Sequence, residues 1–549
     1  MSQIQGIGVG RGIATGPVLT MPEPLAEPAS IPRTTDADVE KSAVAEALEA
    51  VAVELDDRGA RAGGDAQHVL EAQAMMARDP GLVDDVNQRI DDGSTGERAV
   101  FEAFEAFREM LIGLGGYMAE RASDLSDVSQ RVVAHLRGVA APGVPDSDTP
   151  FILVARDLAP ADTALLDLEK VLALVTSEGG PTSHTAILAR SRSIPAIVGV
   201  VDADQLTAGT VVIVDAGAGT ITIEPSSSDI ESAELRTAEL KKIASAPITP
   251  GALADGHEVP LMANLGRPSE AADALALGAE GVGLFRTEFL FLDSTSAPTV
   301  RQQREAYTAL LTAFAGKKVV VRALDAGSDK PLAFLNDSEE ENPALGLRGL
   351  RALRAKEDIL REQLTALAEA QAATTADLWV MAPMVADPAE AEYFVTLAKE
   401  LGIKVAGVMA EVPSLALMAR EVAGVSDFVS IGTNDLTQYT LAADRLLGSV
   451  AHYQDPWHPA VLRLIAMLGE AGREAGKPVG VCGEAAADPD LAVVLVGLGV
   501  TSLSMTPAAL ADVRAELART TLEQAKARAA AALAAPSAAE ARSAAAAVG

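Results

Sequence analysis

The chain has 549 residues, of which 49% are hydrophobic, 22% are charged and only 3% are aromatic. At this length we expect about three or four domains, with cores built mainly from Ala, Val, Leu and Ile. The formal net charge of −33 argues against nucleic acid and anionic membranes as partners, because both are themselves negatively charged.

Cysteine content and the N-terminus indicate the compartment. Cys482 is the single cysteine, so an internal disulfide is impossible and a reducing environment is expected. The first residues lack the basic region and apolar core of a signal peptide, and no stretch of about 18 uninterrupted apolar residues occurs. We therefore expect a cytoplasmic protein without a membrane span.

The first half of the chain changes pattern several times. Residues 1–32 are rich in glycine and predict β-strand and turns, since the glycine spacing fails the dinucleotide-binding fingerprint. From 33 to 140 the pattern is helical, with 22 acidic against 11 basic residues. Such a surface is either a set of solvated helix faces, the commoner case, or a docking surface for a basic partner. Residues 141–224 return to short strands, and 225–249 predict a charged linker helix.

One motif in the strand-rich part carries chemistry. Val171–Thr176 predicts a strand, and 179–190 predicts a glycine-rich turn that leads into a helix capped by Thr182 or Ser183. His184 falls in the first turn of this helix, beside backbone N–H donors and the positive end of the helix dipole. That position suits a group that carries a phosphoryl dianion. A histidine that only caps or packs is the alternative interpretation.

From residue 250 onward, strand and helix patterns alternate. Eight β segments separated by helical stretches predict a (β/α)8 or TIM barrel, so the whole chain is predicted to be a multidomain α/β protein. The Ala-rich end, from about 522 to 549, predicts a helix that frays towards disorder. The predicted strands cover 259–263, 281–284, 319–323, 378–382, 405–410, 428–431, 479–481 and 502–505.

Polar side chains follow the carboxyl ends of the predicted strands, where the reactive groups of such barrels lie. Several arginines and carboxylates on one rim would be costly unless an anion and a cation neutralise them. Guanidinium groups suit phosphate and carboxylate, and carboxylates suit Mg²⁺, so a small ligand that carries both a phosphate and a carboxylate, bridged by Mg²⁺, fits this inventory. Phosphoenolpyruvate (PEP) is one such molecule. The residues are Arg286, Arg322, Asp325, Lys330, Glu411, Asn434, Asp435, Arg445, Cys482 and Glu484.

The segment 179–190 resembles the phosphohistidine motif of the PEP-utilising enzyme family. This family includes Enzyme I of the bacterial sugar phosphotransferase system, pyruvate phosphate dikinase and phosphoenolpyruvate synthase. Thr185, after the histidine, is similar to the Enzyme I version of the motif, because the dikinases usually have Ala there. The barrel segments 283–288, 409–413 and 432–439 also resemble Enzyme I, so the similarity extends over nearly the whole chain.

The resemblance implies roles for the site residues. It implies His184 as the nucleophile that accepts the phosphoryl group, and Cys482 as the acid that protonates the enolate of pyruvate on C3. It implies Glu411 and Asp435 as Mg²⁺ ligands. Contacts with PEP are implied for Arg286, Arg322, Asn434, Asp435, Arg445, Arg348 and Lys330.

The resemblance also implies an architecture and partners. A swivelling phosphohistidine domain of residues 1–32 and 141–224 would carry the inserted helical subdomain 33–140, on which the phosphocarrier protein HPr would dock. The linker helix 225–249 and the PEP-binding barrel 250–549 would follow, and a homodimer would form through the barrel.

Two other interpretations compete with transfer to a carrier protein. A PEP synthase or dikinase would need an ATP-grasp domain, for which the chain has neither the length nor a Gly-x4-Gly-Lys-Ser/Thr loop. A non-catalytic paralogue that senses PEP would be expected to lack His184, Glu411, Asp435 or Cys482, and the sequence contains all of them.

Overall fold

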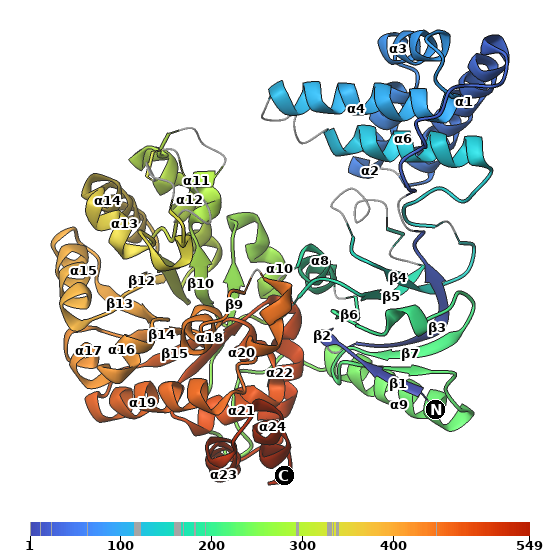
Figure 1. Cartoon of the computed structure of the whole chain (residues 1–549). Helices are drawn as coiled ribbons and strands as arrows, with labels where there is room; N and C mark the ends of the chain where they lie inside the picture. The colour runs from blue at the N-terminus through green and yellow to red at the C-terminus, as the bar shows by residue number, and fades with distance from the viewer. Residues whose placement is uncertain are drawn as a thin grey trace. The chain divides into compact units, whose positions relative to one another are not determined.

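The computed structural model describes residues 2–10, 12–22, 25–62, 64–114, 122–145, 147–158, 166–167, 170–180, 183–192, 194–292, 296–326, 332, 334–335, 340–445 and 447–548. The chain divides into two compact units, Met1–Ala238 and Glu239–Gly549, and the division falls inside helix α9 (Ser227–Ala244; Figure 1). Within these described ranges, none of the helices combines the length and apolar character needed to cross a membrane.

In the described part of the first unit, an eight-stranded sheet has the order β1-β8-β7-β3-β4-β5-β6-β2. Strands β3 to β6 run parallel, and the remaining strands join by antiparallel pairing. Ile152 and its neighbour Leu153 lie in different apolar clusters, so both faces of the sheet are covered. The strands are β1 (Ser2–Gln5), β2 (Ile7–Val9), β3 (Ile13–Thr20), β4 (Phe151–Ala155), β5 (Val171–Thr176), β6 (Ala196–Val198), β7 (Val211–Asp215) and β8 (Thr220–Ile223).

A group of helices lies between β3 and β4 in the chain and has its own apolar core, which includes Leu55 and Phe104. Asp79 caps one of these helices by accepting the amide of Leu82 at 3.0 Å, and Pro80 occupies its first turn, where a backbone N–H is not needed. The described helices of this group are α1 (Ala37–Ala62), α2 (Gly64–Ala77), α3 (Pro80–Asp91), α4 (Gly96–Leu114) and α6 (Ala122–Arg137). The other described α-helix of the unit before α9 is α8 (His184–Arg192), and a 3-10 helix covers Ala203–Gln205.

The described strands of the second unit form a closed barrel in which all neighbours run parallel, as the sequence predicts. The strands are β9 (Leu261–Leu265), β10 (Val282–Arg286), β11 (Lys318–Arg322), β12 (Asp377–Ala382), β13 (Val405–Ala410), β14 (Val429–Gly432), β15 (Val479–Cys482) and β16 (Ser502–Met505). The described helices before the last two are α10 (Ala271–Ala276), α11 (Glu288–Leu292), α12 (Val300–Ala313), α13 (Leu350–Ala355), α14 (Glu357–Ala373), α15 (Pro388–Glu400), α16 (Pro413–Leu417), α17 (Ala419–Val425), α18 (Thr433–Leu441), α19 (Pro459–Ala475), α20 (Glu484–Ala487), α21 (Pro489–Gly497) and α22 (Leu510–Leu517).

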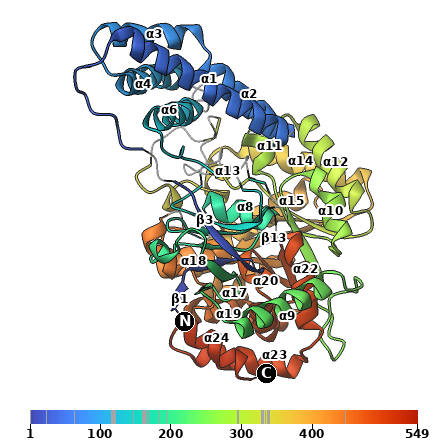
Figure 2. The same ribbon diagram turned by 90° about the vertical axis from the view of Figure 1, so that its right-hand side faces the viewer.

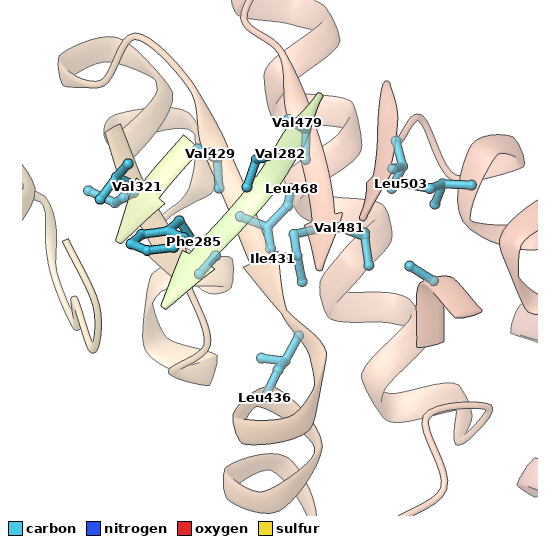
Figure 3. Packing of buried hydrophobic residues seen from close by; sticks show 14 of the residues in the cluster. Val282, Phe285, Val321, Val429, Ile431, Leu436, Leu468, Val479, Val481 and Leu503 are labelled. Carbon is cyan, nitrogen blue, oxygen red and sulfur yellow. The ribbon is translucent and has the colours of Figure 1, made fainter. Parts of the chain in front are cut away.

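Apolar side chains pack on both sides of the barrel wall. Strand residues such as Phe285 and Ile431 belong to a large cluster with Leu468 of helix α19 (Figure 3). Side chains of a strand point alternately to its two sides, so neighbouring positions in or next to the strands point inward and form a smaller cluster. This inner cluster consists of Leu284, Val320, Met381, Met409, Phe428 and Cys482.

The Ala-rich end of the chain differs from the fraying helix predicted from its composition. It forms two helices, α23 (Leu522–Ala534) and α24 (Ala538–Ala546), which lie side by side (Figures 1 and 2). Ala529 and Ala541 are buried, and Gly497 lets the first of these helices approach α21, because a Cβ there would lie 2.2 Å from a backbone oxygen. The small side chains therefore allow the helices to pack closely. Composition alone does not indicate this packing.

Candidate active site

The predicted rim residues stand at the carboxyl ends of strands in the barrel. Arg286, Arg322 and Cys482 are the last residues of β10, β11 and β15, and Glu411 directly follows β13. Asn434 and Asp435 lie in the first turn of α18, which starts where β14 ends. Because the strands are parallel, these ends open at one mouth of the barrel.

Arg322 is buried and its charge is matched by two carboxylates. Its Nη2 lies 3.0 Å from Oε1 of Glu288, and its Nη1 lies 2.9 Å from Oδ2 of Asp325. Burial alone would lower the pKa of this guanidinium, but the charges of Asp325 and Glu288 outweigh that effect and raise it. Arg322 therefore stays charged, and within the described residues its buried Nε has no hydrogen-bond partner.

Arg348 connects Asp325 to Asp435. Its Nη2 donates to Asp325 at 3.2 Å and to Oδ2 of Asp435 at 3.2 Å, while Nη1 donates to Oδ1 of Asp435 at 3.0 Å. Nη1 of Arg445 also lies 3.3 Å from Oδ2 of Asp435. Arg322, Asp325, Arg348, Asp435 and Arg445 thus alternate in sign, and we call them the rim ladder.

Glu411 is buried beside the rim ladder. Its Oε1 accepts the amide of Met384 at 2.7 Å, and the missing side chain of Gly432 leaves room for Oε2, which would lie 2.8 Å from a Cβ there. Burial, then the negative charges of Asp325 and Asp435, raise the pKa of Glu411 to about 8. This crowding of carboxylates would be relieved by a cation.

Cys482 lies just inside the mouth with its thiol hydrogen-bonded on two sides. The thiol donates to the carbonyl of Ile431 at 3.4 Å, and the hydroxyl of Ser430 donates to Sγ at 3.6 Å. Burial raises the pKa of Cys482 to about 11. Asn434 accepts the amide of Glu484 at 3.5 Å and so joins α18 to the turn after Cys482.

Two further predicted residues, Arg286 and Lys330, are not members of the rim ladder as the described contacts define it. Arg286 is exposed, although its positive charge acts on the Cys482 thiol. Lys330 lies outside the described residues, so no geometry is assigned to it.

A buried polar network behind the rim was not predicted from the sequence. Gln363 of α14 accepts the amide of Leu324 at 2.9 Å, and its Nε2 donates to the hydroxyls of Thr287 and Tyr307 at 3.2 and 3.1 Å. Thr287 in turn donates to the carbonyl of Arg322 at 3.0 Å. The network holds the backbone from the carbonyl of Arg322 to the amide of Leu324, and a glutamine inside an apolar helix face was the only sequence signal of it.

The histidine motif opens helix α8 in the first unit. Ser183 caps the helix by accepting the amide of Ala186 at 3.3 Å, as predicted for it, whereas Thr182 lies outside the described residues. Thr185 donates to Asp157 at 3.1 Å, so the turn that contains His184 is tied to the loop after β4. The backbone of His184 therefore stands at the positive end of the helix dipole.

Comparison with known proteins gives the family. The family described as "PEP-utilising enzyme, PEP-binding domain" matches residues 240–522, and the mobile and N-terminal domains of PEP-utilising enzymes match 148–219 and 5–121. A phosphoenolpyruvate-protein phosphotransferase of Streptomyces coelicolor is 55% identical over 95% of this chain and 94% of its own. The chain belongs to the phosphoenolpyruvate-protein phosphotransferase family.

Further relatives have lower sequence identity to this chain. The phosphoenolpyruvate-protein phosphotransferase of Bacillus subtilis is 37% identical over 96% of both chains. A multiphosphoryl transfer protein of Xanthomonas campestris is 40% identical over 94% of this chain and 63% of its own. An NMR solution structure of an Enzyme I protein is 31% identical, with a TM-score of 0.39, and covers 43% of this chain and 99% of that one.

Proposed function

We propose that the chain transfers the phosphoryl group of PEP to its own His184 and then to a histidine of the phosphocarrier protein HPr, with release of pyruvate. This reaction is the first step of the PEP-dependent sugar phosphotransferase system. The observation that carries the proposal is the rim ladder, which sets alternating guanidinium and carboxylate groups at the mouth of a barrel that matches a PEP-binding domain.

The arginines of the ladder would anchor PEP. Guanidinium forks match the geometry of phosphate and carboxylate, and PEP carries both groups. Because each arginine is already paired with a carboxylate, the site holds its positive charges in place before the ligand arrives. Arg286 would approach the ligand from the exposed side of the mouth. Arg322, Arg348 and Arg445 act here as anchors, and Asn434, Asp435 and Lys330 are proposed as further contacts.

Glu411 and Asp435 would hold Mg²⁺. Burial, followed by the negative charges of Asp325 and Asp435, raises the pKa of Glu411, and carboxylate oxygens are the ligands that Mg²⁺ prefers. Among the described residues, no group of three or more His, Cys, Asp or Glu side chains could hold a metal ion by itself. Two carboxylates fit an ion that takes its other ligands from substrate phosphate and water. The bound ion would neutralise charge on the phosphoryl group.

The protein groups then carry the chemistry. Neutral His184 attacks phosphorus in line, the bond from phosphorus to the enol oxygen breaks, and a nitrogen–phosphorus bond forms. The enolate of pyruvate takes the thiol proton of Cys482 on C3, and the electron pair stays on sulfur. Since His184 and the rim belong to different units, the reaction requires that they meet, and the phosphorylated histidine must later reach a second acceptor.

The helices inserted between β3 and β4 are the proposed docking surface for HPr. Residues 33–140 carry 22 acidic and 11 basic side chains, so their surface favours a basic partner. Residues 1–32 and 141–224 would form the swivelling phosphohistidine domain, and 225–249 the linker to the barrel. We also propose a homodimer through the barrel.

Transfer of label from radioactive PEP tests the proposal. With Mg²⁺, the chain should gain one acid-labile phosphate on His184 and pass it to HPr without ATP. The H184A variant should bind PEP and take up no label, whereas H135A, which changes an exposed histidine of α6, should be labelled normally. Label on another residue of H184A would show that this other residue, and not His184, is the nucleophile. Transfer only in the presence of a nucleotide would instead indicate a synthase or dikinase.

A further inference from the structure

The thiol of Cys482 has a specific neighbour on the next strand. Ser430 lies on β14 and Cys482 on β15, and the parallel register places the serine two residues before the position opposite the cysteine. The hydroxyl of Ser430 donates to Sγ at 3.6 Å, while the thiol proton is directed to the carbonyl of Ile431 at 3.4 Å. Both side chains are almost completely buried, with exposed fractions of 4% and 3%.

The surroundings make a thiolate costly at this position. The pKa of the thiol is raised to about 11, mainly by burial and in smaller part by the negative charge of Glu411. The hydroxyl of Ser430 and the positive charges of Arg322 and Arg286 oppose this rise. A donor aimed at sulfur stabilises the charged form more than the neutral form, because hydrogen bonds to ions are the stronger ones.

We propose that Ser430 is a positioning residue for the Cys482 thiol, which it holds at the rim and stabilises as the thiolate. The inference rests on the proposed function, in which the thiol gives its proton to the pyruvate enolate. In that step the S–H bond breaks, a C–H bond forms at C3 and the electron pair remains on sulfur. The Ser430 hydroxyl keeps its own proton and remains a donor to the thiolate.

The inner side of the barrel supplies a matched control. Ser430 and Ser504 line the same cavity of about 20 Å³, together with Lys318 and Trp379. The hydroxyl of Ser504, however, donates to Asn264 at 2.6 Å and not to the thiol. The S430A and S504A variants therefore each remove one hydroxyl from the same cavity, and only S430A removes a partner of Cys482.

Infrared spectroscopy can test the contact directly. The chain has one cysteine, so its S–H stretching band reports Cys482 alone. We expect the band to shift in S430A and to stay in place in S504A and in S430T, which keeps the hydroxyl. A band at the same position in S430A and the wild-type protein would overturn the inference.

Reactivity and turnover test the consequence. At a fixed pH below the pKa of the thiol, alkylation by a small reagent should slow about tenfold in S430A, which corresponds to a rise of about one pKa unit. Pyruvate formation should slow with a larger solvent deuterium isotope effect, while the KM for PEP stays unchanged and S430T restores the rate. Unchanged alkylation and isotope effect in folded S430A would remove Ser430 from the reaction. Full pyruvate formation by C482A would instead remove the thiol and contradict its role in the proposed function, whatever S430A does.

Discussion

Arg348 and Asp435 are joined by two parallel hydrogen bonds, 3.0 Å from Nη1 to Oδ1 and 3.2 Å from Nη2 to Oδ2. The same guanidinium also contacts Asp325, so the loop after β11 and the helix after β14 are held together by one side chain. The planar fork of arginine matches a carboxylate in a way that an ammonium group does not. The orientation of Asp435, a proposed Mg²⁺ ligand, therefore depends on Arg348.

Replacing Arg348 by lysine should lower kcat/KM for PEP. R348K keeps a positive charge but cannot form the fork, so kcat/KM for PEP should fall by about ten- to hundredfold, the value of one or two hydrogen bonds between charged groups. The matched control is R354K, which changes an exposed arginine in helix α13. Steady-state pyruvate release measures both, and equal kcat/KM in R348K and R354K would contradict the role of the fork.

The raised pKa of Glu411 predicts how the metal-free protein responds to pH. The carboxyl holds its proton up to about pH 8 in the folded state but loses it near its ordinary value in the unfolded state. The folded state thus binds more protons between these values, so the free energy of unfolding should fall as pH rises from about 4.5 to 8. Thermal unfolding in the presence of a chelator measures this trend, which should be weaker in E411Q.

Mg²⁺ should reverse that trend. The ion binds the carboxylate and not the protonated acid. Below pH 8, the affinity for Mg²⁺ should therefore increase about tenfold for each unit by which the pH is raised. Calorimetric titration in two buffers at pH 7 should show release of a proton on binding. Proton release that is the same in E411Q as in the wild-type protein would locate the titrating group elsewhere.

Gln363 should matter for the site as well as for stability. Q363L leaves the amide of Leu324 and the hydroxyl of Thr287 without this partner, which should cost about 1–3 kcal/mol in the free energy of unfolding. It should also raise the KM for PEP, because the backbone around Arg322 loses its support. Denaturant unfolding and steady-state kinetics measure the two effects.

Helix α14 offers a control for this prediction. Gln371 is also buried, but it contacts the backbone of Gly402 and Lys404. Q371L should therefore lose stability to a similar extent without a change in the KM for PEP. A KM that rises equally in both variants would mean that the effect is general loosening of the helix.

The packing of the Ala-rich end can be tested at one glycine. In G497A the new Cβ would lie 2.2 Å from the carbonyl oxygen of Ala525, so α23 must move and the free energy of unfolding should fall by about 1–3 kcal/mol. G424A, at an open position of α17, should instead raise it by about 0.5–1 kcal/mol. Thermal unfolding compares the two, and equal stability would show that α23 is not packed against α21.

The strand order of the barrel and the place of the rim could be predicted because they follow from local patterns. Apolar segments of strand length alternate with helices from residue 250 on, and the carboxyl ends of parallel strands must open at one mouth. The polar residues after β11, β13, β14 and β15 were therefore expected to gather before any distance was known. The histidine motif was equally local, since a glycine turn, a capping serine and a helix start are neighbours in the chain.

The sequence alone determined these elements and their order, whereas the partners of each charge were decided by tertiary structure. Arg348 lies 87 residues from Asp435, and Gln363 lies 76 from Thr287, so periodicity carries no information about either pair. The Ala-rich end shows the same limit: small side chains look uninformative in composition but are what allows two helices to approach closely. Hydrophobic periodicity is a property of neighbouring residues, whereas charge pairing and close packing depend on distances that only the folded chain defines.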